Sequence, residues 1–202
     1  MRVLVTGTSA GIGRATTELF LERGHEVAGF DVQAATLTHP GYTHHVVDVR
    51  RPQDFPAGIK PEIIINNAGV QDSDDDLGVN LRGTINVTEF YAFGRRSSGD
   101  MGTGAGALLA KPAPQVRAVV NVGSASGHTG SEFPEYAASK GGVIAFTKSI
   151  AREMARHPPN GPPPPCRARP RPCSCCSGAA SRSTTPASPS PAAWMPPARC
   201  WG

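Results

Sequence analysis

Short apolar runs alternate with longer segments of helical periodicity over the first three quarters of the chain. The run 63–65 is continuously apolar, which is typical of a strand covered on both faces. Apolar residues recur at helical spacing between 14 and 23 and again after residue 136. The expected strands are 2–6, 26–30, 43–47, 62–65 and 116–122, and the expected helices are 14–23, 77–93 and 136–156. This alternation predicts an α/β fold with a parallel, doubly wound sheet.

The composition changes abruptly after residue 156. Residues 157–202 hold 13 of the 20 prolines, all five cysteines and five arginines, but no Asp, Glu, Leu, Ile, Val or Phe. Such a segment cannot bury enough apolar surface to offset the entropy of ordering it. We therefore expect a folded domain over 1–156 and a disordered tail over 157–202. The net charge of +4 belongs to this tail, because 1–156 holds 15 basic and 16 acidic residues.

Several classes of protein fit the sequence poorly. No stretch of 18 apolar residues is present, so we expect no membrane-spanning helix. The first apolar run is too short for a signal peptide and the body has no cysteine, which favours the cytoplasm. Cys173, Cys175 and Cys176 lack a second ligand pair at zinc spacing, so no metal is expected. A nucleic-acid-binding tail ranks last, because its five arginines are accompanied only by Trp194 and Trp201 as aromatic residues.

A glycine-rich turn joins the first expected strand to the first expected helix. Gly7, Gly11 and Gly13 follow the spacing T-G-x-x-x-G-x-G, which is wider than the common G-x-G-x-x-G pattern. A dinucleotide pyrophosphate needs backbone N–H groups, a helix N-terminus and positions without side chains where the backbone approaches it. The turn therefore predicts a dinucleotide site, and the alternative is an ordinary glycine-rich connection.

Asp31 follows the second expected strand, 18 residues beyond Gly13. A carboxylate at this point can accept hydrogen bonds from both adenosine ribose hydroxyls, and it repels a 2′-phosphate. The residue therefore favours NAD over NADP. The alternative is a solvated aspartate at a strand end.

Tyr136 and Lys140 lie four residues apart on one expected helix and so share a face. A nearby ammonium stabilises a phenolate, and a tyrosine so tuned can exchange a proton with an alcohol or carbonyl. Ser124, 12 residues upstream and just after a strand, could donate a hydrogen bond to the substrate oxygen. The alternatives are a chance Tyr–Lys spacing and a turn serine.

Together these features resemble the short-chain dehydrogenase/reductase family, in the family's order and over residues 1 to about 156. The matching elements are Thr6-Gly7-Thr8-Ser9-Ala10-Gly11-Ile12-Gly13, Asp48, Asn66-Asn67-Ala68-Gly69, Asn80, Ser124 and Tyr136-Ala137-Ala138-Ser139-Lys140. The resemblance implies a Rossmann-like fold and reversible hydride transfer between NAD(H) and a carbonyl or secondary alcohol. It also implies a small-molecule substrate and a homo-oligomer if the fold is complete. From the composition, no membrane or nucleic-acid partner is expected.

The resemblance also assigns roles to individual residues. Ser124 would orient the substrate oxygen and Tyr136 would act as acid or base. Lys140 would hold the nicotinamide ribose and favour the phenolate, and Asn80 would anchor a water in the proton relay. The cofactor-binding residues would be Thr6, Gly7, Ser9, Gly11, Ile12, Gly13, Asp31, Asp48, Asn67, Ala68, Gly69, Tyr136 and Lys140, with Asp48 at the adenine.

The chain departs from the family in the connections and after residue 156. Only ten residues separate Gly69 from Asn80, so a helix there should be shortened or lost, whereas 94–115 predicts a long loop. The prolines at 162–165 cannot supply the N–H groups of a central strand, so strands six and seven should be missing. We hypothesise that the tail is an out-of-frame translation. The alternative function is therefore a catalytically impaired or inactive dinucleotide-binding remnant.

Overall fold

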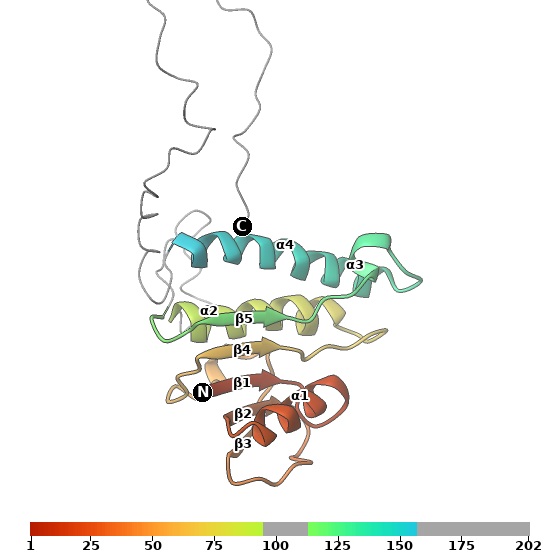
Figure 1. Ribbon diagram of the computed structural model, residues 1–202. Coiled ribbons are helices and arrows are strands. Elements are labelled where there is room, and N and C mark those ends of the chain that lie inside the picture. The colour runs from red at the N-terminus through yellow and green to blue at the C-terminus, as the bar shows by residue number, and fades with distance from the viewer. Residues whose placement is uncertain (95–112, 157–202) are drawn as a thin grey trace, which may run out of the picture. The chain divides into compact units, whose positions relative to one another are not determined.

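The computed structural model describes residues 1–94 and 113–156 (Figure 1). Its five strands are Arg2–Thr6 (β1), Glu26–Asp31 (β2), Tyr42–Val46 (β3), Ile63–Asn66 (β4) and Ala118–Asn121 (β5). Its α-helices are Gly11–Glu22 (α1), Thr84–Phe93 (α2), Ser126–Thr129 (α3) and Pro134–Arg156 (α4). A 3-10 turn at Pro52–Asp54 (η1) and a π-helical segment at Leu77–Gly83 (η2) complete this part of the chain.

The five strands form one parallel sheet in the order β3-β2-β1-β4-β5. The chain builds outward from β1 to β2 and β3, then returns to the other side of β1 and adds β4 and β5. All carboxyl ends therefore lie along one edge, with a switch point between β1 and β4, where ligands bind in doubly wound folds. The expected Rossmann-like, doubly wound sheet is confirmed.

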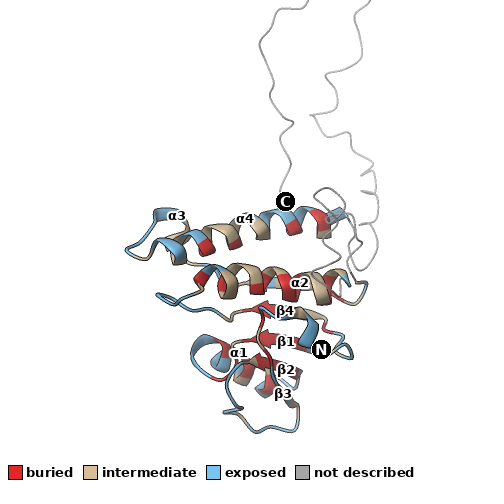
Figure 2. Cartoon of the chain, turned by 180° about the vertical axis from the view of Figure 1, so that it is seen from behind, coloured by how far each residue is buried: buried red, intermediate tan, exposed pale blue. Residues whose placement is uncertain are grey.

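Alternation along β1 divides the core into two layers. Val3 and Val5 pack with Leu21 of α1, whereas Leu4 packs with Val87 and other residues of α2. Successive side chains of a strand point to opposite faces, so these contacts place α1 and α2 on opposite faces of the sheet. Figure 2 shows buried residues along the strands and on α2.

The predicted elements are present, with several boundaries shifted. The first helix begins at Gly11 rather than at residue 14, because the glycine-rich turn itself enters the helix. The strand expected over 116–122 covers only Ala118–Asn121. The helix expected over 77–93 is a π-helical segment followed by α2. No helix lies between β4 and η2, as the short Gly69–Asn80 spacing predicts. Most of the loop expected over 94–115, and the whole tail 157–202, lie outside the described residues.

Candidate active site

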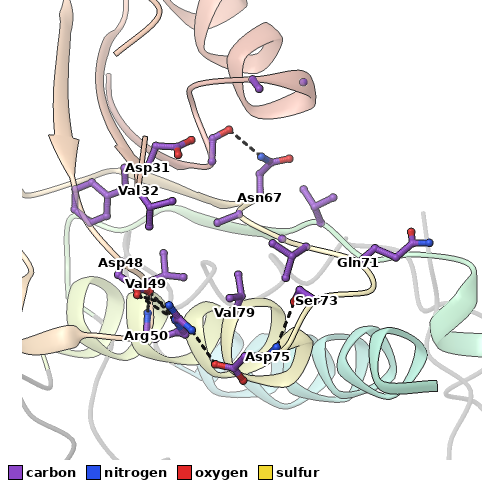
Figure 3. Close-up of a pocket in the computed structure, with 18 of the residues that line it drawn as sticks. Asp31, Val32, Asp48, Val49, Arg50, Asn67, Gln71, Ser73, Asp75 and Val79 are labelled. Atoms are coloured by element: carbon purple, nitrogen blue, oxygen red, sulfur yellow. Dashed lines mark hydrogen bonds and ion pairs between the residues drawn. The ribbon is translucent and has the colours of Figure 1, made fainter. Parts of the chain in front are cut away.

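A cavity of about 860 Å³ opens at the carboxyl edge of the sheet, at the switch point (Figure 3). It extends from the turn after β1 and the end of β2, past the segment after β4, to the beginning of α4. The predicted site residues that line it are Gly7, Gly11, Ile12, Asp31, Asp48, Asn67, Ala68, Gly69, Tyr136 and Lys140. Thr6, Ser9, Gly13, Asn80 and Ser124 are not among its lining residues.

The glycine-rich turn leaves one end of the cavity open to an anion. Gly7 and Gly11 have φ of 74° and 56°, which residues with a Cβ adopt only with strain. A Cβ on Gly13 would overlap the carbonyl oxygen of Gly7, whereas a Cβ on Gly11 would meet open space. No side chain caps the N-terminus of α1, and no acidic residue lies in its first turn. Backbone N–H groups at this helix end are therefore suited to binding a phosphate.

Hydrogen bonds between the ends of β1 and β4 hold this turn in place. The Thr6 hydroxyl oxygen accepts the backbone N–H groups of Asn67 and Ala68 at 3.0 and 2.9 Å. The Asn67 side-chain amide donates to the carbonyl oxygen of Thr6 at 3.0 Å. Thr6 is buried, so it positions the cavity wall rather than lining the cavity.

A tyrosine that the sequence analysis did not single out also supports the turn. The Tyr42 hydroxyl on β3 donates to the Thr8 hydroxyl at 2.8 Å, and burial raises the pKa of Tyr42. The ring passes Gly29 so closely that a Cβ there would collide with the phenol oxygen. The glycine in the middle of β2 therefore lets β3 reach the turn after β1.

The Asp31 carboxylate is held by two backbone N–H groups at the end of β2. Ser9 donates to Oδ2 and Gln33 donates to Oδ1, each at 2.9 Å. Ser9 also donates its hydroxyl to the carbonyl oxygen of Ala34 at 3.0 Å. A carboxylate has about four acceptor positions, so two remain for further donors. Ser9 thus orients Asp31, which faces the cavity (Figure 3).

Asp48 is bound tightly by Arg50, which the sequence analysis did not identify. The Arg50 Nε and Nη2 atoms donate to Asp48 Oδ1 and Oδ2 at 3.0 and 2.7 Å. These side-chain hydrogen bonds from Arg50 hold the pKa of Asp48 below its usual range. The same guanidinium pairs through Nη1 with Asp75 at 3.0 Å. The only sign of this ion pair in the sequence was an aspartate followed two residues later by an arginine, at 48 and 50.

Tyr136 and Lys140 on α4 close the opposite end of the cavity. Lys140 is only 5% exposed, and its Nζ donates to the carbonyl oxygen of Val122 at 3.0 Å. The same nitrogen lies 5.7 Å from the centroid of the Tyr136 ring. Burial lowers the pKa of Lys140. The helical spacing thus brings a phenol and a buried amine together, as predicted.

Asn80 lies in η2 and joins the cavity wall to α4. Its side-chain nitrogen donates to the carbonyl oxygen of Val70 at 2.8 Å and to the Ser139 hydroxyl at 3.0 Å. Its side-chain oxygen accepts the Val70 N–H at 2.7 Å. Ser139 in turn donates to the carbonyl oxygen of Tyr136 at 2.7 Å. Asn80 is therefore connected to Tyr136 through a buried serine, although it does not line the cavity.

Ser124 lies on the segment between β5 and α3. It is partly buried, and its hydroxyl oxygen accepts the Ser126 N–H at 3.2 Å. The cavity is lined by the preceding residue, Gly123, and not by Ser124. The structure therefore brings Tyr136 and Lys140 together at the cavity, while Ser124 stands one residue beyond its lining.

Two other features are absent from the described part of the chain. Within residues 1–94 and 113–156, no three His, Cys, Asp or Glu side chains are grouped so as to hold a metal ion. Within the same ranges, no helix is both long and apolar enough to cross a bilayer.

Comparison with known proteins places this architecture in a family. Residues 56–158 match the family model for short chain dehydrogenases, so the match ends next to the change of composition after residue 156. The chain is 35% identical over 174 residues to 3-oxoacyl-[acyl-carrier-protein] reductase FabG of Vibrio harveyi, covering 75% of this chain and 66% of that protein. It is 28% identical over 191 residues to (3R)-3-hydroxyacyl-CoA dehydrogenase of Rattus norvegicus, covering 76% and 68%. The chain thus spans about two thirds of the length of these relatives.

Solved structures show the same fold. Aldohexose dehydrogenase of Thermoplasma acidophilum in its ligand-free form has a TM-score of 0.60 and 27% identity, covering 76% of this chain and 61% of that one. A 4-hydroxyisoleucine dehydrogenase complexed with NADH has a TM-score of 0.60 and 23% identity, covering 77% and 70%. From the family-model match, the parallel sheet and the ordered motifs, we conclude that the chain belongs to the short-chain dehydrogenase family.

Proposed function

We propose that this chain is an oxidoreductase that transfers a hydride between NAD(H) and a carbonyl or secondary alcohol. The observation that carries the proposal is the single cavity that joins the glycine-rich turn and Asp31 at one end to Tyr136 and Lys140 at the other. Its volume of about 860 Å³ lies within the range of small-molecule and cofactor sites.

The residues that line the cavity fit a nicotinamide dinucleotide. The uncapped N-terminus of α1 and the open space at Gly11 suit a pyrophosphate. Asp31 retains acceptor positions for ribose hydroxyls, and Asp48 lies across the cavity from it (Figure 3). When bound, the dinucleotide supplies or accepts the hydride. The similar solved structure of 4-hydroxyisoleucine dehydrogenase, which is complexed with NADH, supports this choice of cofactor.

The proposed chemistry of the protein is a proton exchange at Tyr136. The phenol oxygen would give a proton to a substrate carbonyl oxygen, or take one from an alcohol. Lys140, fixed by the Val122 carbonyl, would stabilise the phenolate and hold the nicotinamide ribose. Asn80 would anchor a water of the proton relay, and Ser124 would orient the substrate oxygen. Asn80 is already linked to the backbone of Tyr136 through Ser139.

The direct test is a screen of the purified chain with NADH, NADPH and their oxidised forms. The substrate panel should include secondary alcohols, sugars, steroids and 3-oxoacyl thioesters, the last because of the names of the relatives. We expect turnover with at least one substrate and saturable binding of NADH. Failure to bind either reduced dinucleotide would contradict the proposal.

The preference for NAD over NADP rests on Asp31. The substitution Asp31→Asn removes the charge that would repel a 2′-phosphate. The asparagine side chain keeps one oxygen that can accept the hydrogen bond from the Ser9 N–H. We expect the ratio of NADH to NADPH affinities to fall by about tenfold or more, since each 1.4 kcal/mol corresponds to a factor of ten. Asp54→Asn, which removes an exposed charge outside the cavity, is the control. If this ratio of affinities is unchanged in Asp31→Asn, the preference for NAD over NADP depends on residues other than Asp31.

A second candidate function is dinucleotide binding without turnover. It is favoured by the position of Ser124, which lies beyond the residues lining the cavity. NADH binding without turnover on any substrate of the panel would support it over the first. The homo-oligomer, the cytoplasmic location and the division of the chain after residue 156 remain predictions.

A further inference from the structure

We propose that Arg50 is a positioning residue for the adenine end of the cofactor, acting by tying the segment after β3 to the segment after β4. We call the Asp48–Arg50–Asp75 contacts the Arg50 bridge. The inference rests on the proposed dinucleotide-binding function, and none of the motifs that carry the family resemblance includes Arg50 or Asp75.

Arg50 uses two sides of its guanidinium. One side pairs with Asp48 through Nε and Nη2, and the Arg50 backbone N–H donates to Asp48 Oδ1 at 2.9 Å. Such two-pronged pairs fix the plane of the carboxylate as well as its position. The remaining Nη1 donates to Asp75 at 3.0 Å, 25 residues further along the chain. Figure 3 shows the guanidinium between the two carboxylates at the wall of the cavity.

Asp75 transmits this contact to η2. Its Oδ1 accepts the Gly78 N–H at 2.8 Å, and its own N–H is bonded to the Ser73 hydroxyl at 3.3 Å. No helix lies between β4 and η2, so this short connection forms the cavity wall directly. The Arg50 bridge therefore joins two connections that are held by different strands.

The bridge also changes the charge of the cavity. Among the described residues, the lining includes the carboxylates of Asp31, Asp48, Asp74 and Asp75 but only two cationic side chains, Arg50 and Lys140. An anionic dinucleotide would be repelled by this excess of negative charge. Arg50 offsets the charges of Asp48 and Asp75 at the end of the cavity where the family resemblance places the adenine.

The effect should be local rather than global. The side chains of Arg50 and Asp75 are 44% and 45% exposed, and ion pairs of this exposure contribute little to the free energy of unfolding. A purely structural role would lower the melting temperature. A positioning role instead weakens dinucleotide affinity and loosens the joined segments while the melting temperature stays nearly constant.

The first test is a double-mutant cycle read out as the dissociation constant for NADH. The variants are Arg50→Ala, Asp75→Asn and the double variant, with Arg51→Ala as the control for loss of a neighbouring positive charge. We expect Arg50→Ala to raise the dissociation constant by about fivefold, a size typical of coupled contacts. Asp75→Asn should raise it by less, because that substitution also removes a negative charge from the cavity. The double variant should be no weaker than Arg50→Ala alone. The proposal would be overturned if the two single substitutions changed the dissociation constant independently, so that their factors multiplied in the double variant. It would also be overturned if Arg50→Ala and Arg51→Ala raised the dissociation constant equally.

The second test uses the chain without cofactor. Hydrogen exchange of the backbone amides at 72–79 should be faster in Arg50→Ala and Asp75→Asn than in the wild-type chain, and unchanged in Arg51→Ala. Unchanged exchange in both bridge variants would overturn the bridge even if NADH binds well. If the wild-type chain does not bind NADH, the proposed function fails and the cofactor role of Arg50 fails with it, whereas the exchange result still decides whether the bridge exists.

Discussion

Three buried polar side chains hold the inner end of the cavity by donating hydrogen bonds to backbone carbonyl groups. Asn80 bonds to Val70, Ser139 to Tyr136 and Lys140 to Val122. Truncating Asn80 or Lys140 would remove the side-chain donor from a carbonyl outside any helix, which costs about 1–3 kcal/mol when that group is buried. The geometry around Tyr136 is thus fixed by side chains that do not themselves react.

Lys140 gives a prediction for the dependence of stability on pH. Burial lowers its pKa below the ordinary 10.5, so over the interval between the two values the unfolded chain binds more protons than the folded one. The free energy of unfolding attributable to this group therefore rises with pH across that interval. Denaturant titrations of Lys140→Met at a series of alkaline pH values should lack this rise.

The matched control is Lys148→Met, which removes an exposed lysine of the same helix. Its dependence on pH should follow that of the wild-type chain. If Lys140→Met and the wild-type chain change in parallel, the burial of the Lys140 amine is contradicted.

The sequence predicted some of the residues at the site and missed others. Tyr136 and Lys140 were predictable because helical spacing alone puts them on one face, and the structure brings them to the cavity. Arg50 and Asp75 were not, because their contact depends on how two separate connections approach each other in space.

At the scale of elements, the turn between β1 and α1 shows why glycine is required. Gly13 lies in the first turn of α1 against the Gly7 carbonyl, and both of these backbones are fixed by surrounding structure. Strand positions were predictable from continuous apolar runs, as at β1, whose bounds are as predicted. The π-helical segment η2 was not, because its seven residues are too few for the apolar pattern to distinguish a wider turn from an α-helical one.

Replacing Gly13 by alanine tests this turn. The added Cβ would overlap a backbone oxygen that cannot rotate away, so we expect Gly13→Ala to lose about 1–3 kcal/mol of stability. Chemical denaturation measures the loss. Gly58→Ala adds the same atom where nothing lies within 4 Å, and it should be nearly neutral. Equal stabilities of the two variants would show that the turn is looser than described.

At the scale of the molecule, the sheet ends at β5 in the described part of the chain. Val119 packs against the core on the α2 side, whereas Val120 on the opposite face is 48% exposed. An edge strand with exposed apolar residues promotes pairing between molecules. The parallel sheet was predictable from the strand–helix alternation, but this exposure was not, because it depends on which helices cover which strands.

Val120→Thr should slow self-association. The substitution keeps a β-branched side chain and removes an exposed apolar surface. Light scattering of the purified chain at fixed concentration should grow more slowly than for the wild type, with the free energy of unfolding nearly unchanged. Val119→Thr, placed in the core-facing position, should instead lose stability. If the scattering of Val120→Thr grows as fast as that of the wild type, the face of β5 that carries Val120 is not the cause of self-association.

The central claim is that Tyr136 exchanges the proton that accompanies hydride transfer, and the most direct measurement is the turnover of Tyr136→Phe beside its affinity for NADH. The phenylalanine ring retains the packing but has no hydroxyl. We predict that kcat falls by about 10²–10⁴-fold, the usual contribution of acid–base catalysis, with NADH affinity within about twofold of wild type. Undiminished turnover in Tyr136→Phe would contradict the account.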